Sequence, residues 1–373
     1  MFGGYEFRIM TNDELLSKTI NYLRFPLIVG VVFIHNNMMT IDIQGTEINY
    51  SDCSWLTTII YLFSNAVPAV CVPLFYFFSG NLFFYKTSFN RTVYVRKIKK
   101  RCSTLLVPYL IFNFLGFLIF LIQMHPSFYN IFPLLNNYRV DIVTFLSSFW
   151  ISTIPKEMAG GMTPIDHPLW FVRDLFLMCI ASPIVYYVIK RVGIAFLIAM
   201  GSFWFFQLGS FMGLPSIDHQ PLFFFPLGAY FSIHHFNFVE YACKMKWTMY
   251  VFVFCVICDI VFRDDSFNIV FSRMGILLGI VALPCAVSLL IKGRVIKERK
   301  SWSDASFFIY ALHGLFISKY MKVLILLLTP QSPFLILFIY FFVPISTIII
   351  CLIINNFLKR YLTSTVRILT GGR

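Results

Sequence analysis

Apolar segments long enough to cross a lipid bilayer recur along the whole chain, and this recurrence limits its fold more than any other feature. A transmembrane helix needs about 20 predominantly apolar residues. Only 13% of the residues are charged and 58% are hydrophobic, too few charges to cover a water-exposed globule. The sequence therefore excludes a soluble enzyme and predicts an all-α polytopic membrane protein. We expect residues 1–373 to form a single bundle of about ten transmembrane helices, with no soluble domain, spanning residues 22–41, 59–85, 104–124, 168–189, 193–212, 219–236, 247–263, 268–291, 302–321 and 334–358.

One apolar stretch is too short to be a further span. It runs from Asp141 to Ile154, inside the long connection that precedes the fourth expected helix. Apolar stretches of this length are typical of re-entrant or interfacial segments. We therefore expect a short re-entrant or interfacial helix there.

Basic residues gather in particular connections and predict the orientation of the chain. Connections 86–103 and 292–301 are rich in Lys and Arg, whereas the connection from Ile41 to Thr58 has acidic residues and no basic ones. Cytoplasmic loops of membrane proteins carry the excess of Lys and Arg. We therefore expect both termini and both basic loops to be cytoplasmic. The net charge of +13 then reflects these loops and the lipid bilayer, with no nucleic acid as a partner.

Two ionisable residues in the first expected helix share one face. Arg24 and His35 are eleven residues apart, which is three helical turns with about 20° left over and about 16 Å of rise. His313, in the ninth expected helix, lies at a matching depth because that helix also enters from the cytoplasm. The two histidines therefore indicate one polar cavity. Independent packing contacts between helices remain the alternative for each histidine.

Other polar residues have a functional and a structural interpretation. Arg173 in the fourth expected helix and Arg273 in the eighth either serve a substrate or form structural ion pairs. Asp304 and Ser306 at the start of the ninth are typical of helix caps. The basic run in connection 86–103 is either a topogenic, lipid-facing patch or a docking site for a phosphorylated cofactor. Its members considered for docking are Arg96, Lys97, Lys100 and Arg101.

Several motifs occur in the order found in one family of membrane enzymes. Arg24 and His35 match a basic residue, ten others and then a histidine in the first span. With this pair, the sequence resembles acyltransferase family 3, integral-membrane acyltransferases that act mostly on bacterial surface glycans. The other matching motifs are Pro73-Leu-Phe-Tyr-Phe-Phe-Ser79-Gly80, Leu105-Leu-Val-Pro108-Tyr109, Trp170-Phe-Val-Arg173, Phe225-Pro-Leu-Gly228 and Ser306-Phe-Phe-Ile-Tyr310-Ala-Leu-His313. The basic loop departs from the family's Arg-x-x-Arg, since Arg96 is followed three residues later by Lys99.

The resemblance implies an activity, a location and residue roles. It implies transfer of an acyl group, usually acetyl, from acyl-CoA to a hydroxyl of a surface or lipid-linked polysaccharide, in the bacterial cytoplasmic (inner) membrane and without a metal. His35 is the expected general base, either by direct activation of the hydroxyl or through an acyl-histidine. Arg24 would hold the phosphopantetheine. Donor binding is assigned to Arg96, Lys97, Lys100, Arg101 and Arg173, and oxyanion or acceptor contacts to His313, Tyr310, Trp170 and Arg273.

Competing interpretations use the same residues differently. A transporter or flippase for a lipid-linked glycan would need the same polar cavity without catalysis, although the sequence has no internal repeat of the kind that many transporters have. A scaffold or channel leaves the paired histidines unexplained. Within the family, a lipid, a peptide or an amine is an alternative acceptor. Neither the acyl group nor the oligomeric state follows from the sequence.

Overall fold

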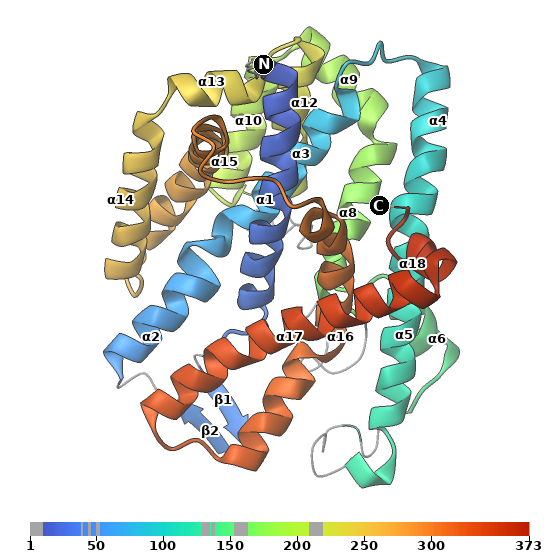
Figure 1. The fold of residues 1–373 in the computed structure, drawn as a ribbon, viewed down its shortest axis with the longest axis vertical. Coiled ribbons are helices and arrows are strands. Elements are labelled where there is room, and N and C mark those ends of the chain that lie inside the picture. Colours follow the sequence, from blue (N-terminus) through green and yellow to red (C-terminus); the bar gives the residue numbers. More distant parts are fainter. Residues whose placement is uncertain are drawn as a thin grey trace, which may run out of the picture.

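The computed structural model describes residues 10–38, 40–43, 46–49, 53–128, 135, 139–152, 163–208 and 219–372. Long helices run roughly along one direction and form a bundle (Figure 1). In chain order the elements are α1 (Asn12–Ile34), β1 (Thr40–Ile43), β2 (Thr46–Asn49), α2 (Ser54–Tyr61), η1 (Leu62–Ala66), η2 (Pro68–Val70), α3 (Cys71–Phe84), α4 (Arg91–Arg101), η3 (Cys102–Leu106), α5 (Val107–Gln123), η4 (Pro126–Phe128), α6 (Ile142–Ser147), η6 (His167–Leu169), α8 (Trp170–Ile180), α9 (Ser182–Arg191), α10 (Ile194–Phe205), α12 (Gln220–Ile233), α13 (Phe238–Lys244), α14 (Trp247–Val261), α15 (Asn268–Lys292), α16 (Lys300–Leu328), α17 (Pro333–Tyr361) and α18 (Thr363–Leu369).

The prediction of a polytopic, helical membrane protein is confirmed. Within the described residues, six helices are long and apolar enough to cross a bilayer, and seven if the pair bent by 62° at Ala181 is counted as one span. Each of the ten apolar segments contains a helix, but α10, α12 and α14 are shorter than a full span. The exact number of crossings stays a prediction. The expected short segment is α6, whose Ile142, Val143 and Leu146 side chains are exposed.

Two elements differ from the expectation. The first helix ends at Ile34 instead of continuing to residue 41, and an antiparallel hairpin follows in which Thr40 pairs with Asn49. Asn36 and Asn37 are poor helix formers, and the side-chain amide of Asn36 donates a hydrogen bond to the Tyr340 carbonyl, 2.9 Å away. The alternation of β-branched and polar residues in both strands favours the hairpin.

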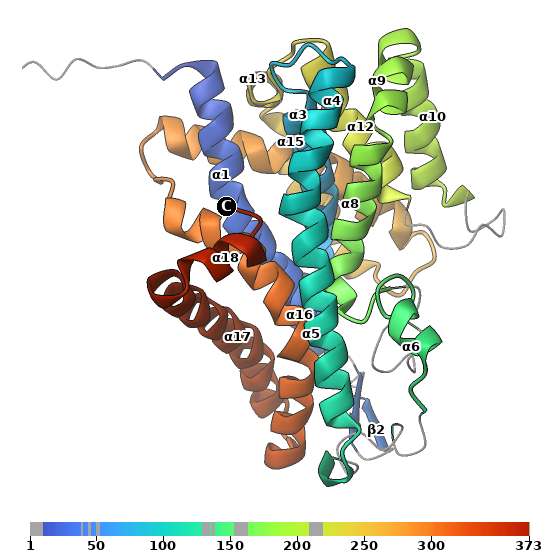
Figure 2. The same ribbon diagram turned by 90° about the vertical axis from the view of Figure 1, so that its right-hand side faces the viewer.

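The basic connection 86–103 is mostly helical. Its main part is α4, which begins where the Asn90 side chain accepts a hydrogen bond from the Val93 amide. Through η3, α4 continues into α5, so the basic residues extend a membrane-spanning helix (Figure 2). Arg and Lys are good helix formers, and this stretch has no Gly or Pro before Pro108. The second basic connection is shorter than expected, because α15 ends at Lys292 and α16 begins at Lys300.

Helices α3 and α12 cross at two glycines. A Cβ atom on Gly80 would lie 2.0 Å from the Phe225 carbonyl oxygen, and one on Gly228 would lie 1.9 Å from the Phe77 carbonyl oxygen. Ser232 donates a hydrogen bond of 2.7 Å to the Asn81 carbonyl at the same crossing. Small residues allow such close approach of membrane helices. Both glycines belong to the sequence motifs, so those motifs serve packing.

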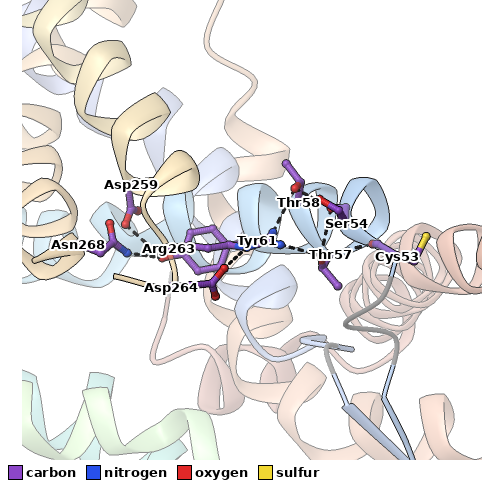
Figure 3. Close-up of polar contacts among 9 residues, drawn as sticks. All are labelled: Cys53, Ser54, Thr57, Thr58, Tyr61, Asp259, Arg263, Asp264 and Asn268. Atoms are coloured by element: carbon purple, nitrogen blue, oxygen red, sulfur yellow. Dashed lines mark hydrogen bonds and ion pairs between the residues drawn. The ribbon is translucent and has the colours of Figure 1, made fainter. Parts of the chain in front are cut away.

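A polar network joins α2 to the α14–α15 hairpin (Figure 3). The Tyr61 hydroxyl donates to a carboxylate oxygen of Asp259, 3.1 Å away, and accepts from the Asn268 amide at 3.1 Å. Arg263 donates to the hydroxyl oxygens of Thr57 and Thr58 at 3.0 and 3.1 Å. Asp259 is only 3% exposed, so its partners compensate its removal from water.

Removing the hydroxyl group at the centre of this network is expected to destabilise the fold. Tyr61→Phe would leave Asp259 and Asn268 without that partner, at a cost of about 1–3 kcal/mol in the free energy of unfolding. Thermal unfolding of the purified protein in detergent measures the change. Tyr250→Phe is the matched control, because that α14 side chain is 77% exposed. Equal unfolding temperatures for the two variants would contradict the assignment.

Candidate active site

Three histidines from separate parts of the chain meet inside the bundle. His35 caps the C-terminal end of α1, His167 opens η6, and His313 lies in α16. The His35 ring centroid is 5.2 Å from that of His167 and 5.3 Å from that of His313. His35 and His313 therefore lie close together, as their matching depth predicted, but neither is among the residues that line the cavity described below. From the sequence, no role was assigned to His167. The only signal in the sequence was that this residue is a further histidine beside an apolar segment.

Hydrogen bonds to main-chain carbonyls orient the α16 side of this cluster. The Nδ1 atom of His313 lies 3.1 Å from the Ile309 carbonyl oxygen. Because a carbonyl only accepts, Nδ1 carries the proton and Nε2 is left as an acceptor. The Tyr310 hydroxyl donates to the Pro168 carbonyl. His313 is fully buried, whereas His35 and His167 remain partly exposed.

The segment that carries His167 is held between α5 and α16. The Ile165 amide donates to the Ser148 carbonyl at 2.8 Å, and the Asp166 amide donates to the Asn113 side chain at 3.2 Å. Gly314 gives this segment its space, since a Cβ atom there would lie 2.3 Å from an Asp166 carboxylate oxygen. The Asp166 side chain is 1% exposed. Packing and backbone hydrogen bonds therefore place a buried carboxylate next to the histidines.

A cavity of about 220 Å³ lies between α1, α3, α8 and α16 and ends near the histidines. Its α1 wall has residues at helical spacing, Ile20, Arg24, Ile28 and Val31, and His35 continues this face one turn further. Arg24 therefore lines the cavity, whereas His35 lies one turn beyond its last α1 residue and is not part of the lining. At the inner end, Val31 and Tyr310 stand about one turn from His35 and His313. The polar residues of the lining are Arg24, Ser79, Arg101, Ser303, Asp304, Ser306 and Tyr310.

Comparison with known proteins identifies the family. The family model described as "Acyltransferase domain" matches residues 17–355. The chain belongs to acyltransferase family 3. The succinoglycan biosynthesis protein ExoH of Rhizobium meliloti (strain 1021) is 24% identical over 373 residues, covering 97% of this chain and 94% of that protein. No solved structure matches the chain.

Four basic residues of connection 86–103 were assigned to donor binding in this acyltransferase. Arg101 lines the cavity, whereas Arg96, Lys97 and Lys100 do not. Lys97 donates to the Phe83 carbonyl and to the Thr87 hydroxyl, 3.2 Å away, and so stabilises the C-terminal end of α3. Arg96 and Lys100 are exposed on α4. Geometry therefore favours Arg24 and Arg101 as the cations available to an anion in the cavity.

Three further assigned residues lie outside the cavity lining. Arg173 pairs with Asp174 at 2.8 Å and donates to the Trp150 carbonyl at 2.7 Å, which ties α8 to the segment after α6. Arg273 donates to the carbonyls of Trp204, at 2.7 Å, and Phe205, at the C-terminal end of α10. Trp170 is the first residue of α8 and packs partly buried against the core. These contacts describe structural roles, and roles in catalysis for these residues stay predictions.

The interpretation of Asp304 and Ser306 as helix caps is wrong. Helix α16 begins at Lys300 with Arg299 as its N-cap residue, so both side chains lie inside the helix and line the cavity. Asp304 interacts electrostatically with Arg24 across this space. The cavity therefore contains an acidic group as well as its two cations.

The described residues include no group of three or more His, Cys, Asp or Glu side chains arranged to hold a metal ion. The histidine rings of the cluster meet edge-on or tilted, with 75° and 49° between ring planes. A neutral imidazole has one nitrogen that donates and one that accepts a hydrogen bond. The arrangement is suited to general acid–base chemistry.

Proposed function

We propose that this membrane acyltransferase transfers an acetyl group from acetyl-CoA to a hydroxyl of a cell-surface or lipid-linked polysaccharide, with His35 as general base. The observation that supports this most is the cavity that contains Arg24 and Arg101 and ends about one turn from His35. Membership of the acyltransferase family supplies the reaction type. The polysaccharide acceptor is inferred from the relative named for succinoglycan biosynthesis.

The donor is proposed to enter from the basic side of the bundle. Coenzyme A is a cytosolic polyanion, and Arg side chains bind phosphate oxygens with paired donors. Arg24 and Arg101 line the cavity and would bind the phosphates, and the phosphopantetheine arm would extend toward Val31 and Tyr310. The protein would then lie in the bacterial cytoplasmic membrane with both termini in the cytosol.

The transfer step follows from the proposed base. His35 takes the proton of the acceptor hydroxyl as its oxygen attacks the thioester carbonyl. A carbon–oxygen bond forms, the carbon–sulfur bond breaks, and the proton passes to the departing CoA thiolate. The products are the O-acetylated glycan and CoA. His35 suits this task because a neutral imidazole has an unprotonated nitrogen that can take the proton.

Acyl transfer in detergent tests the proposal. The purified protein is incubated with radiolabelled acetyl-CoA and with polysaccharide from cells that lack the gene. We expect label in the polysaccharide, removable by mild alkali, without any membrane or ion gradient. A flippase would leave the polysaccharide unlabelled under these conditions, and that result would reject the enzyme.

Variants of the cations separate the cavity from the exposed α4 surface as the donor site. Arg24→Gln and Arg101→Gln are each expected to weaken acetyl-CoA binding about tenfold, because each removes charge-assisted hydrogen bonds. Arg96→Gln and Lys100→Gln are the matched controls, since these side chains are exposed on α4. Equilibrium binding of labelled acetyl-CoA measures all four. Weaker binding in the control pair alone would move the donor site to α4.

A further inference from the structure

Buried hydrogen-bonding atoms without partners surround the histidine cluster. Among the described residues, both carboxylate oxygens of Asp166, Nδ1 of His167 and Nε2 of His313 have no hydrogen-bond partner. Asp166 is 1% exposed and His313 is fully buried. Buried polar atoms are almost always paired, because each unpaired one costs about 1–3 kcal/mol. Several of them at one place indicate a site whose partners arrive with a ligand.

Three of these four atoms, those of Asp166 and His167, belong to a segment whose backbone is held by hydrogen bonds. Residues 165–168 are fixed by the Ser148 carbonyl and by the Asn113 and Tyr310 side chains. Their own side chains are consequently free to serve a ligand. Packing alone does not require this carboxylate, since a small apolar residue beside Gly314 would avoid its desolvation.

Asp166 and His167 lie in the connection that follows α6, and from there they reach the histidine cluster. Figure 2 shows α6 toward the end of the bundle that carries the β-hairpin, away from the start of α4. The cavity is lined by Arg24 on α1, by Arg101 at the C-terminal end of α4 and by Ser303 near the start of α16. His35 therefore stands between the inner end of the cavity and the Asp166–His167 segment.

Hydroxyl groups match the unpaired atoms. A carboxylate and the unprotonated nitrogen of an imidazole accept hydrogen bonds, and a sugar supplies several adjacent O–H donors. Lys319 interacts electrostatically with Asp166 and donates to the Leu315 carbonyl at 2.9 Å, so a cation supports the carboxylate from α16. The thioester group itself has no donor, whereas the pantetheine arm of the acyl donor carries amide N–H groups and a hydroxyl, so the test below measures acceptor and donor separately.

We propose that Asp166 and His167, with Nε2 of His313, form the acceptor subsite, in which they bind the sugar hydroxyls and hold the reacting one beside His35. This inference rests on the proposed function. It makes His167 a further substrate-contacting residue and Asp166 the group that fixes the sugar's orientation. The donor contacts stay with Arg24 and Arg101.

The test separates acceptor binding from donor binding. Asp166→Asn and His167→Gln are made in the full-length protein and expressed in cells that lack the gene. Mass spectrometry of the surface polysaccharide measures its acyl content, and equilibrium binding measures the affinity of the purified variants for acetyl-CoA. His219→Gln is the control, since this histidine lies at the start of α12 against the Phe203 ring.

We expect the acyl content to fall about tenfold or more in both variants while acetyl-CoA affinity stays within about twofold of the wild type. Thermal unfolding checks the fold. His167→Gln is expected to unfold at the wild-type temperature, which a merely structural role for His167 would not allow. If Asp166→Asn fails to fold, His167→Gln and His313→Gln carry the test.

Two results would overturn the inference. One is unchanged acyl content in folded His167→Gln protein. The other is a loss of acetyl-CoA affinity that parallels the loss of acylation, which would place these residues in the donor site. Failure of the proposed function is distinct from both, because wild-type protein would then restore no acyl groups to the polysaccharide.

Discussion

Gly228→Ala is expected to destabilise the protein by about 3 kcal/mol or more and to abolish acyl transfer. The added Cβ atom would lie 1.9 Å from the Phe77 carbonyl oxygen, a main-chain atom that no rotamer change can move. The helices α3 and α12 would have to separate, and overpacking of this kind is costly. Separation would also strain the Ser232–Asn81 hydrogen bond at the crossing.

The activity would be lost with the stability because α3 forms one wall of the cavity proposed to bind the donor. Val72, Phe75 and Ser79 line that cavity on the helix that Gly228 contacts. Thermal unfolding and acetyl-CoA binding of the purified protein measure both effects. Gly275→Ala in α15 is the matched control, since its Cβ atom would meet nothing closer than the Cys255 Cβ at 3.7 Å. Equal stability of the two alanine variants would contradict the packing account.

Sequence patterns were enough to predict the helical bundle and part of the candidate site, namely Arg24, His35 and His313. Apolar segments of bilayer length located every long helix, because each must satisfy its own backbone hydrogen bonds in lipid. The eleven-residue spacing predicted that Arg24 and His35 share one face, and in the structure Arg24 lines the cavity while His35 lies one turn beyond Val31. The matching depth predicted that His313 lies near His35, and their ring centroids are 5.3 Å apart.

Sequence patterns did not predict the contacts that the segments between the helices make. His167 and Asp166 reach the cluster because side chains on α5 and α16 hold their segment, and no periodicity in the sequence records that. The roles of Arg173 and Arg273 depend on main-chain carbonyls of distant segments, Trp150 and Trp204. The basic charge of residues 91–101 led to their interpretation as a connection, although their local helix propensity indicates a helix.

The proposed donor and acceptor sites meet at one imidazole, that of His35. Arg24 and Arg101 mark the cavity, the Asp166–His167 segment marks the proposed acceptor side, and His35 stands between them. Opposite approaches of this kind keep water away from the thioester until the acceptor hydroxyl is present. On this account His35 is the residue that the reaction needs most.

His35→Ala is accordingly expected to lower the turnover number about a hundredfold or more while leaving acetyl-CoA affinity nearly unchanged. A general base acts on the reacting proton and contributes little to ground-state binding of the donor. The variant is expected to fold, because the ring is partly exposed and α1 is held by its other contacts. His234→Ala, at the C-terminal end of α12, controls for loss of a histidine elsewhere.

The most direct measurement is the turnover of His35→Ala with saturating radiolabelled acetyl-CoA and polysaccharide acceptor, made on protein whose folding and donor binding match the wild type. The account predicts a loss of about a hundredfold or more in transferred label, with His234→Ala retaining wild-type turnover. Near-wild-type turnover by folded His35→Ala protein would contradict it.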